Sequence, residues 1–116
     1  MIRIYHNPRC SKSRFALNHL KNNGSEFSTI EYLNVSFTEE SLGALLEKLQ
    51  MNPSEIIRTN EVDFKEKFSG KVFTNEEWIK ILIENPKLIQ RPIVEMDSRA
   101  CIAREVEVLN QFLGNK

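Results

Sequence analysis

The 116-residue chain is predicted to form an α/β fold, a mixed β-sheet with a run of helices inserted into it. Near the N-terminus, two β-type segments flank an amphipathic helical segment, an order that favours parallel strands with a crossover helix. Near the C-terminus, two more β-type segments flank a polar turn and predict an antiparallel hairpin. The stretch between these pairs, about residues 38–86, carries helical patterns and is too long for a simple crossover. We therefore expect one domain, residues 1–116, with an inserted helical lobe.

The first strand, the first helix and the second strand each follow from a local pattern. Residues 1–5 alternate apolar and polar side chains, which is typical of a strand. Loop-forming residues around Pro8 end it. A helix is expected from Ser11 to residues 22–24, where Asn-Asn-Gly tolerates left-handed backbone. The second strand is predicted over residues 27–33.

Four helices are predicted in the insertion. The first begins near Thr38, with acidic residues in its first turn. Its apolar positions have the spacing of one helix face: Leu42, Leu45, Leu46 and Leu49. A short helix is expected to begin at Asn52, whose side chain would cap it, and another spans about residues 62–68. The fourth begins at a capping box headed by Thr74 and ends before Pro86.

The C-terminal elements are predicted to be two strands and a helix. The strands cover residues 93–96 and 100–103 and are joined by the polar turn at residues 97–99. The last helix is expected over about residues 105–113, with Gly114 ending it. Its inward positions are expected to be Val108, Leu109, Phe112 and Leu113.

The composition narrows the possible partners. Sixteen basic residues balance sixteen acidic ones, which argues against a broad nucleic-acid footprint. No apolar run is long enough to cross a bilayer, and the N-terminus lacks the apolar core of a signal peptide. We therefore expect a cytoplasmic protein without nucleic-acid or membrane partners. Two cysteines are too few for a disulfide framework, and the absence of a heptad pattern favours a monomer.

Cys10 is the candidate nucleophile because it lies at the predicted N-terminus of the first helix. Unpaired backbone N–H groups and the positive end of the helix dipole stabilise a thiolate there. Four nearby side chains add positive potential: His6, Arg9, Lys12 and Arg14. The alternative, a buried packing cysteine, fits these polar neighbours poorly. His6 is either a cation or hydrogen-bond partner of Cys10 or a plain loop residue. Ser13 either hydrogen-bonds the thiolate or lies on the helix surface.

Local spacing excludes several other kinds of site. Ser13 occupies the second cysteine position of a Cys-x-x-Cys motif, so a thioredoxin-type dithiol is excluded. A cysteine phosphatase loop has five residues between its cysteine and arginine, whereas three residues separate Cys10 from Arg14. The two cysteines and two histidines show no metal-ligand spacing, so no metal site is expected. His19 is expected to be a solvated helix residue.

Four segments, in the same order and spacing, resemble the glutaredoxin-dependent arsenate reductase family. The run from Tyr5 to Arg14, Tyr-His-Asn-Pro-Arg-Cys-Ser-Lys-Ser-Arg, resembles its N-terminal motif. Residues 90–94, Gln-Arg-Pro-Ile-Val, resemble its second hallmark. Residues 57–60 resemble its middle arginine segment, and residues 86–89 resemble the approach to its Arg-Pro motif. The resemblance extends over essentially the whole chain and is closest to the short arsenate-reductase-like members.

This resemblance implies a thioredoxin-like fold with a helical insert, and Cys10 as the nucleophile that attacks arsenate. It also implies three arginines that bind the oxyanion: Arg58, Arg91 and Arg104. Glu105 stands where the family usually has a proline after the third arginine. Pro92 matches a proline that is cis in thioredoxin-like folds and should bring the backbone beside Cys10. Without the resemblance, the three arginines would be assigned to a helix C-terminus or to surface ion pairs.

The resemblance further implies a reaction without a tightly bound cofactor. Cys10 attacks arsenate, water leaves, and an external thiol such as glutathione adds to the arsenic. A mixed disulfide on Cys10 is then resolved by glutaredoxin or an equivalent donor. Cys101, in an apolar strand, is expected to be a buried structural thiol, with an internal disulfide only if it lies close to Cys10.

Two other functions remain open at the sequence level. A transcription regulator of the Spx type shares this fold and binds RNA polymerase, but commonly carries the Cys-x-x-Cys switch that Ser13 removes here. A glutathione-linked thiol transferase would need Cys10 but not the arginines. Convergence of the three arginines on the Cys10 sulfur would favour the arsenate reductase hypothesis.

Overall fold

The computed structural model describes residues 2–24, 26–34 and 37–114, and the chain divides into two compact units. The first unit is formed by the chain up to Val35 and from Arg91 onward. The second unit is the continuous segment Ser36–Gln90. The predicted insertion, about residues 38–86, covers almost the same stretch as this second unit. The one-domain organisation of the chain stays a prediction.

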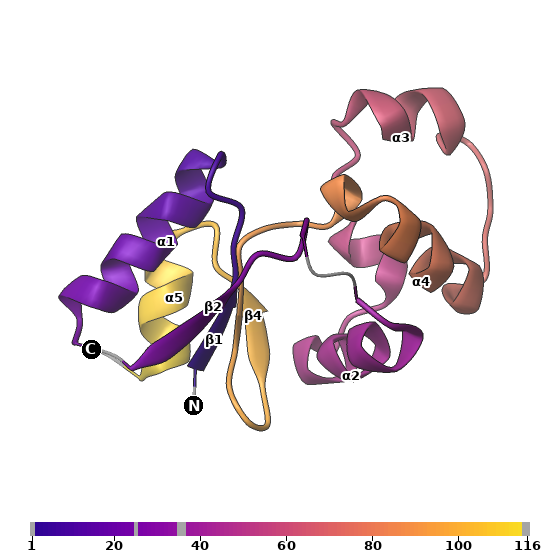
Figure 1. Ribbon diagram of the computed structural model, residues 1–116. Coiled ribbons are helices and arrows are strands. Elements are labelled where there is room, and N and C mark those ends of the chain that lie inside the picture. The colour runs from indigo at the N-terminus through magenta and orange to yellow at the C-terminus, as the bar shows by residue number, and fades with distance from the viewer. Residues whose placement is uncertain (1, 25, 35–36, 115–116) are drawn as a thin grey trace. The chain divides into compact units, whose positions relative to one another are not determined.

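The first unit is built on a four-stranded mixed sheet with the order β2-β1-β3-β4 (Figure 1). Its strands are β1 (Ile2–Tyr5), β2 (Phe27–Ile30), β3 (Ile93–Glu95) and β4 (Ala100–Ile102). Strand β1 pairs in parallel with β2 and antiparallel with β3, and β3 pairs antiparallel with β4. The predicted parallel pair and C-terminal hairpin are therefore both confirmed.

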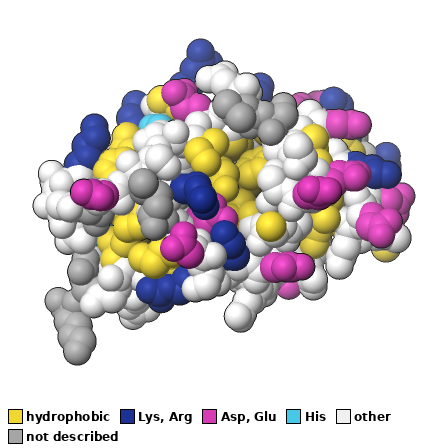
Figure 2. Space-filling model, turned by 60° about the horizontal axis from the view of Figure 1, so that its bottom comes forward, with side chains coloured by type: hydrophobic (Ala, Val, Ile, Leu, Met, Phe, Trp, Pro, Cys, Tyr) yellow, Lys and Arg dark blue, Asp and Glu magenta, His cyan; other side chains and the backbone are white. Residues whose placement is uncertain are grey.

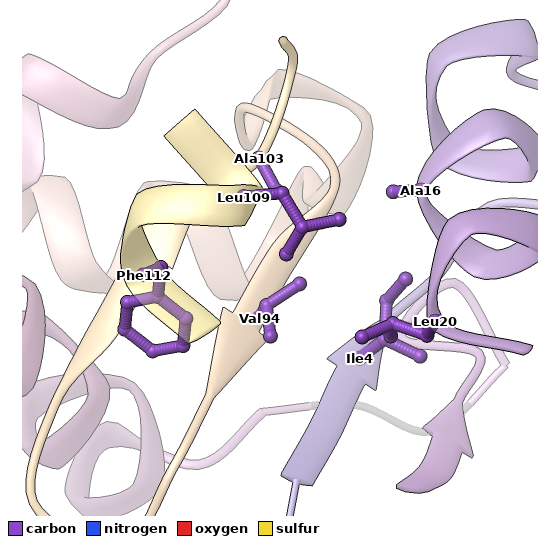
Figure 3. Close-up of a cluster of buried hydrophobic side chains, with 7 residues drawn as sticks. All are labelled: Ile4, Ala16, Leu20, Val94, Ala103, Leu109 and Phe112. Atoms are coloured by element: carbon purple, nitrogen blue, oxygen red, sulfur yellow. The ribbon is translucent and has the colours of Figure 1, made fainter. Parts of the chain in front are cut away.

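Two helices, α1 (Ser11–Asn22) and α5 (Val106–Leu113), pack on the same face of this sheet. Figure 3 shows the buried cluster that joins them to β1 and β3: Ile4, Ala16, Leu20, Val94, Ala103, Leu109 and Phe112. The two helices are also linked directly, because His19 Nε2 lies 2.7 Å from Asn110 Oδ1. The expectation that His19 is merely solvated is therefore wrong.

The boundaries of three elements differ from the sequence expectation. Strand β2 ends at Ile30, not at residue 33, because its partner β1 ends opposite it at Tyr5. Beyond that pair, the His6 N–H donates to the Ile30 carbonyl at 2.8 Å and the chain turns away. Strands β3 and β4 are each one residue shorter than expected.

On α5, Val108 is 40% exposed, so its inward assignment is wrong.

A buried carboxylate on the sheet escaped the sequence analysis. Glu95 of β3 is almost fully buried and accepts hydrogen bonds from the Tyr5 hydroxyl at 2.8 Å and the Arg3 guanidinium at 3.0 Å. Burial, together with the neighbouring Glu95 carboxylate, raises the pKa of Tyr5, so the phenol remains a donor. The hydrogen bonds from Tyr5 and Arg3 offset the free-energy cost of burying the Glu95 carboxylate.

Within the described residues, the regular elements of the second unit are helices and 3-10 turns, together with one isolated antiparallel bridge between Ile57 and Ile89. The unit contains α2 (Glu39–Leu49), the 3-10 turn η1 (Pro53–Ile56), α3 (Val62–Lys67), α4 (Asn75–Glu84) and the 3-10 turn η2 (Pro86–Leu88). Residues on the inner faces of these helices are buried, among them Leu42, Leu45, Leu46, Ile56, Trp78, Leu82 and Leu88. The helical periodicity read from the sequence therefore identifies the buried faces correctly.

Two of these helices begin at capping boxes. The Thr38 and Ser41 side chains each bond the other's backbone N–H at the start of α2, at 3.0 and 2.8 Å. Thr74 and Glu77 do the same at the start of α4, as predicted. Asn52 was expected to cap η1 but makes no side-chain cap. Its carbonyl instead accepts from the backbone N–H three residues on, in the tighter 3-10 geometry.

The surface agrees with the balanced charge of the sequence. Basic and acidic side chains are intermixed on the face shown in Figure 2, without a field of one sign. Within the described part of the chain, no helix has both the length and the apolar character needed to cross a bilayer.

Candidate active site

Cys10 lies at the open N-terminus of α1, as the sequence predicted. It is the N-cap residue, with extended backbone angles of −95° and 122°, and its side chain makes no capping hydrogen bond. Its carbonyl accepts the first helical bond, from the Arg14 N–H at 3.0 Å, while its own N–H donates to the Asn7 carbonyl at 3.0 Å. The thiol is half-buried. Its sulfur therefore lies where the first helical N–H groups have no helical partner.

Ser13 fixes the shape of the loop that precedes the helix. Its hydroxyl is completely buried and accepts a hydrogen bond from the Asn7 N–H at 3.0 Å. The same oxygen lies 2.6 Å from His6 Nδ1. Because a neutral imidazole offers one unprotonated nitrogen, this pair is satisfied when Ser13 donates to His6 Nδ1. Asn7 adds a further constraint, since its side-chain oxygen accepts from the Arg9 N–H at 3.0 Å.

This arrangement changes the roles expected for His6 and Ser13. Burial lowers the pKa of His6, against the opposing charge of Glu31, so the imidazole is neutral near pH 7. It bonds Ser13 and does not supply the positive charge expected beside Cys10. The Ser13 hydroxyl is likewise engaged with His6 and Asn7, and it is the backbone N–H of Ser13 that helps to lower the pKa of Cys10.

The surroundings of Cys10 favour its thiolate. Partial burial works against ionisation, but three groups outweigh it and hold the pKa of Cys10 below its usual value. These groups are the backbone N–H of Ser13, the backbone N–H of Lys12 and the guanidinium of Arg91, which both donates to the sulfur and supplies positive charge. Hydrogen bonds and charge at a helix start are the recognised causes of such a shift.

Arg91 is held beside Cys10 at the point where the chain re-enters the sheet. The Arg91–Pro92 peptide bond is cis, as predicted, and the Pro92 carbonyl accepts from the Ala103 N–H at 2.8 Å. The Nε atom of Arg91 is buried and has no hydrogen-bond partner within the described residues. The Arg91 guanidinium therefore has one donor that acts on the Cys10 sulfur and a second, its Nε–H, that has no partner within the described residues.

Arg104 lies next to the first turn of α1. It lines a cavity of about 390 Å³ together with Ser11, Lys12, Phe15 and Glu105. Ser11 and Lys12 directly follow Cys10, so Arg104 approaches the helix that carries the nucleophile. Both Arg91 and Arg104 thus belong to the same unit as Cys10 and lie near the start of its helix.

Arg58 and Arg14 differ from Arg91 and Arg104 in their positions. Arg58 belongs to the helical unit, where its guanidinium pairs with Glu61 and its backbone N–H donates to the Leu88 carbonyl at 2.6 Å. Its expected place among the oxyanion-binding arginines stays a prediction. Arg14 is exposed on α1, and its charge helps to lower the pKa of His6.

Cys101 has the opposite character to Cys10. It lies on β4 opposite Val94 and packs against the core cluster. Burial raises the pKa of Cys101 to about 11, although Arg99 opposes the shift. Both cysteines are free, so the structure contains no internal disulfide between them. Cys101 is nevertheless only partly buried, and its structural role stays a prediction.

Sequence reasoning missed some of the site. Asn7, predicted only as a loop former, is buried and bonds both Ser13 and Arg9. Phe15 and Glu105 were not recognised as lining a cavity.

Comparison with known proteins gives consistent matches. The model of the ArsC family matches residues 5–112. The uncharacterized protein YfgD of Escherichia coli is 40% identical over 115 residues, covering 97% of both chains. An arsenate reductase of Escherichia coli is 32% identical, covering 97% of this chain and 80% of that protein. The structure of a putative arsenate reductase from Yersinia pestis superposes with a TM-score of 0.89 and 33% identity, covering 96% of this chain and 99% of that one.

Proposed function

The chain belongs to the ArsC family, and from this premise we propose that it reduces arsenate or a similar oxyanion with Cys10 as nucleophile. The observation that carries the proposal is the environment of the Cys10 sulfur. Two backbone N–H groups at the start of α1 and the Arg91 guanidinium together favour the thiolate. A thiolate beside an arginine with an unused buried donor is suited to attack on a small anion.

The arginines would hold the oxyanion. Arsenate is tetrahedral and negatively charged near neutral pH, and guanidinium groups offer paired donors that remain charged. Arg91 and Arg104 lie in the same unit as Cys10 and are the first two candidates. Arg58 would be the third, on the strength of the family resemblance. Their positive charge would offset the repulsion between a thiolate and an arsenate anion.

The proposed reaction consumes two thiols for each arsenate. The Cys10 thiolate bonds to arsenic(V), and an arsenate hydroxyl takes a proton from solvent and leaves as water. An external thiol then adds to the arsenic, and a second arsenate hydroxyl leaves as water with the proton of that thiol. The two arsenic-bound sulfurs join in a mixed disulfide on Cys10, which leaves an electron pair on arsenic and reduces arsenic(V) to arsenic(III), released as arsenite after hydration. Glutaredoxin or an equivalent thiol protein then restores Cys10 by exchange.

An arsenate-dependent NADPH oxidation assay, coupled through glutathione, glutathione reductase and glutaredoxin, tests this proposal. We expect turnover with the wild type and Cys101→Ser, because Cys101 has a raised pKa and packs in the core. Cys10→Ser should be inactive. Absence of arsenite from the wild-type reaction, under conditions where a known arsenate reductase is active, would reject the proposal. A glutathione-linked thiol transferase would instead retain activity toward a glutathionylated peptide after Arg91→Gln.

A further inference from the structure

A second cavity adjoins the loop that leads into α1. Its volume of about 350 Å³ falls within the roughly 300–1,000 Å³ typical of small-molecule pockets. Two segments line it, the loop between β1 and α1 and the stretch that follows β2: Asn7, Pro8, Arg9, Glu31, Leu33 and Asn34. All six residues belong to the first unit, so the cavity is formed within that unit. The groups that lower the pKa of Cys10 are not among them.

Asn7 brings an unused hydrogen-bond donor to this cavity. The residue is only 8% exposed, and its side-chain Oδ1 accepts from the Arg9 N–H at 3.0 Å. Its Nδ2 atom donates to no group in the part of the chain that the structure describes. A donor on a nearly buried side chain costs free energy unless water or a ligand accepts from it. An acceptor in the cavity would therefore be bound by a side chain that the loop already holds in place.

Two opposite charges line the cavity without neutralising each other. Arg9 and Glu31 are both exposed, and within residues 2–24, 26–34 and 37–114 neither side chain forms an ion pair. The Glu31 carboxylate accepts a long hydrogen bond of 3.5 Å from Asn34 Nδ2. Pro8 and Leu33 add apolar surface to the same lining. A complementary ligand would carry a carboxylate and an ammonium group close together, with an apolar group beside them.

We propose that this cavity binds a free α-amino acid with an aliphatic side chain. The carboxylate of the amino acid would accept from the Arg9 guanidinium and from the Asn7 side-chain amide, and its ammonium group would face Glu31. Its side chain would pack on Pro8 and Leu33. The site goes beyond the proposed function, because binding there requires neither the nucleophile nor an oxyanion.

Binding at this cavity would act on the loop that carries the nucleophile. The Asn7 carbonyl accepts from the Cys10 N–H at 3.0 Å, and the Asn7 N–H donates to the Ser13 hydroxyl at 3.0 Å. An amino acid bound by Asn7 and Arg9 would stabilise this loop conformation by mass action. The site would thereby make the stability of the loop respond to the concentration of a small metabolite.

A nuclear magnetic resonance titration of the nitrogen-15-labelled full chain tests the proposal. The probes are leucine, glycine, N-acetylleucine and leucinamide, of which the last three lack the apolar side chain, the ammonium group and the carboxylate, respectively. Leucine should shift the resonances of the Asn7 side-chain NH2 group and the Arg9 backbone N–H in a saturable way. It should also bind more tightly than each of the other three probes.

Two charge-removing variants separate the two ends of the ligand. Arg9→Gln should weaken leucine and N-acetylleucine binding about two- to fivefold, the range expected for an exposed ion pair, and leave leucinamide binding unchanged. Glu31→Gln should weaken leucine and leucinamide binding by a similar factor and leave N-acetylleucine binding unchanged. Arg99→Gln and Glu26→Gln are the matched controls, since both residues are exposed and lie outside the cavity lining.

Three results would overturn the proposal. One is the absence of a saturable shift at Asn7 with leucine up to its solubility limit, which would leave water as the partner of the amide. Another is equal affinity for leucine, N-acetylleucine and leucinamide. The last is an equal loss of leucine binding in the variants and in their controls, which would assign the effect to net charge. None of these measurements depends on arsenate reduction, so the proposed function is tested separately.

Discussion

At the scale of single residues, backbone and side-chain groups around Cys10 have different roles. The backbone N–H groups of Lys12 and Ser13 act on the sulfur, whereas the Ser13 hydroxyl closes the loop through His6 and Asn7. Arg91 is the side chain that acts on the sulfur directly. Ionisation of Cys10 and integrity of the loop should therefore respond to different substitutions.

Arg91→Gln should raise the pKa of Cys10, because it removes a positive charge and a charged donor from the sulfur. Iodoacetamide alkylation measured against pH reports this pKa, since only the thiolate reacts. In the wild type, reactivity should persist below the usual range of a cysteine and disappear as pH falls through the lowered pKa. The variant's curve should shift to higher pH. Arg99→Gln is the matched control, and an equal shift in that variant would contradict the role of Arg91.

Ser13→Ala should destabilise the protein by about 1–3 kcal/mol, the cost of leaving buried polar groups without their partner. The Asn7 N–H loses its acceptor, and His6 Nδ1 loses its donor. Urea unfolding measures this loss. Ser98→Ala, at an exposed turn position, should change stability little. A Ser13→Ala variant as stable as this control would show that water replaces the hydroxyl at no cost.

How far the sequence predicts the site depends on the kind of residue. Cys10 and the cis bond before Pro92 could be predicted, because they lie in motifs whose role follows from the family resemblance. The pairing of His6 with Ser13 could not, because side-chain direction there depends on how the loop closes. Lys12 and Glu105 line the same cavity but come from segments far apart in the chain. Local sequence patterns do not indicate that these two segments lie close together.

At the scale of elements, the starts of α2 and α4 follow directly from local chemistry, whereas the cap expected at Asn52 is not made. Both capping boxes use a threonine and a partner three residues later, so each can be recognised in a short stretch of sequence. Strand ends are harder to predict, because they depend on where the partner strand stops, as β2 shows at Ile30. In the short helix α5, apolar character alone does not identify the buried face. Val108 is apolar but exposed, while Leu109 and Phe112 lie in the core.

Thr38→Ala and Thr74→Ala should each cost about 1 kcal/mol, since each removes the side-chain acceptor of a helix N-cap. Urea unfolding gives the free energy of unfolding of each variant. Hydrogen exchange should also show faster exchange at the first turns of α2 and α4, respectively. Thr59→Ala, at an exposed position in a turn, is the matched control. A loss no larger than that of this control would mean that the capping bonds contribute nothing net.

At the scale of the whole molecule, the chain forms two compact units, and each has its own buried apolar residues. The sheet unit is assembled from both ends of the chain, and the helical unit from its middle. The stretch predicted as an inserted helical lobe, about residues 38–86, lies within this helical unit, and a long helical stretch between strand pairs does not fit a single crossover.

Leu82→Ala should destabilise the chain by roughly 2–5 kcal/mol, because Leu82 is fully buried in the helical unit. We expect amide exchange to accelerate most in α2 and α4 and less in β1 and β3, since the lost contacts lie within the helical unit. Leu33→Ala, at a residue 37% exposed, is the control. Equal acceleration in both units would indicate that the chain opens only as a whole.

The order of strands in the sheet also has a consequence for synthesis on the ribosome. Strand β1 lies between β2 and β3, and Ile4 of β1 pairs with Val94 of β3. During synthesis, β1 can pair with β2 early. Its other edge has no partner until β3, near the end of the chain, has been made. An unpaired edge invites association with other nascent chains. Early folding of the intervening helices would shorten the loop to be closed and so reduce the duration of that exposure.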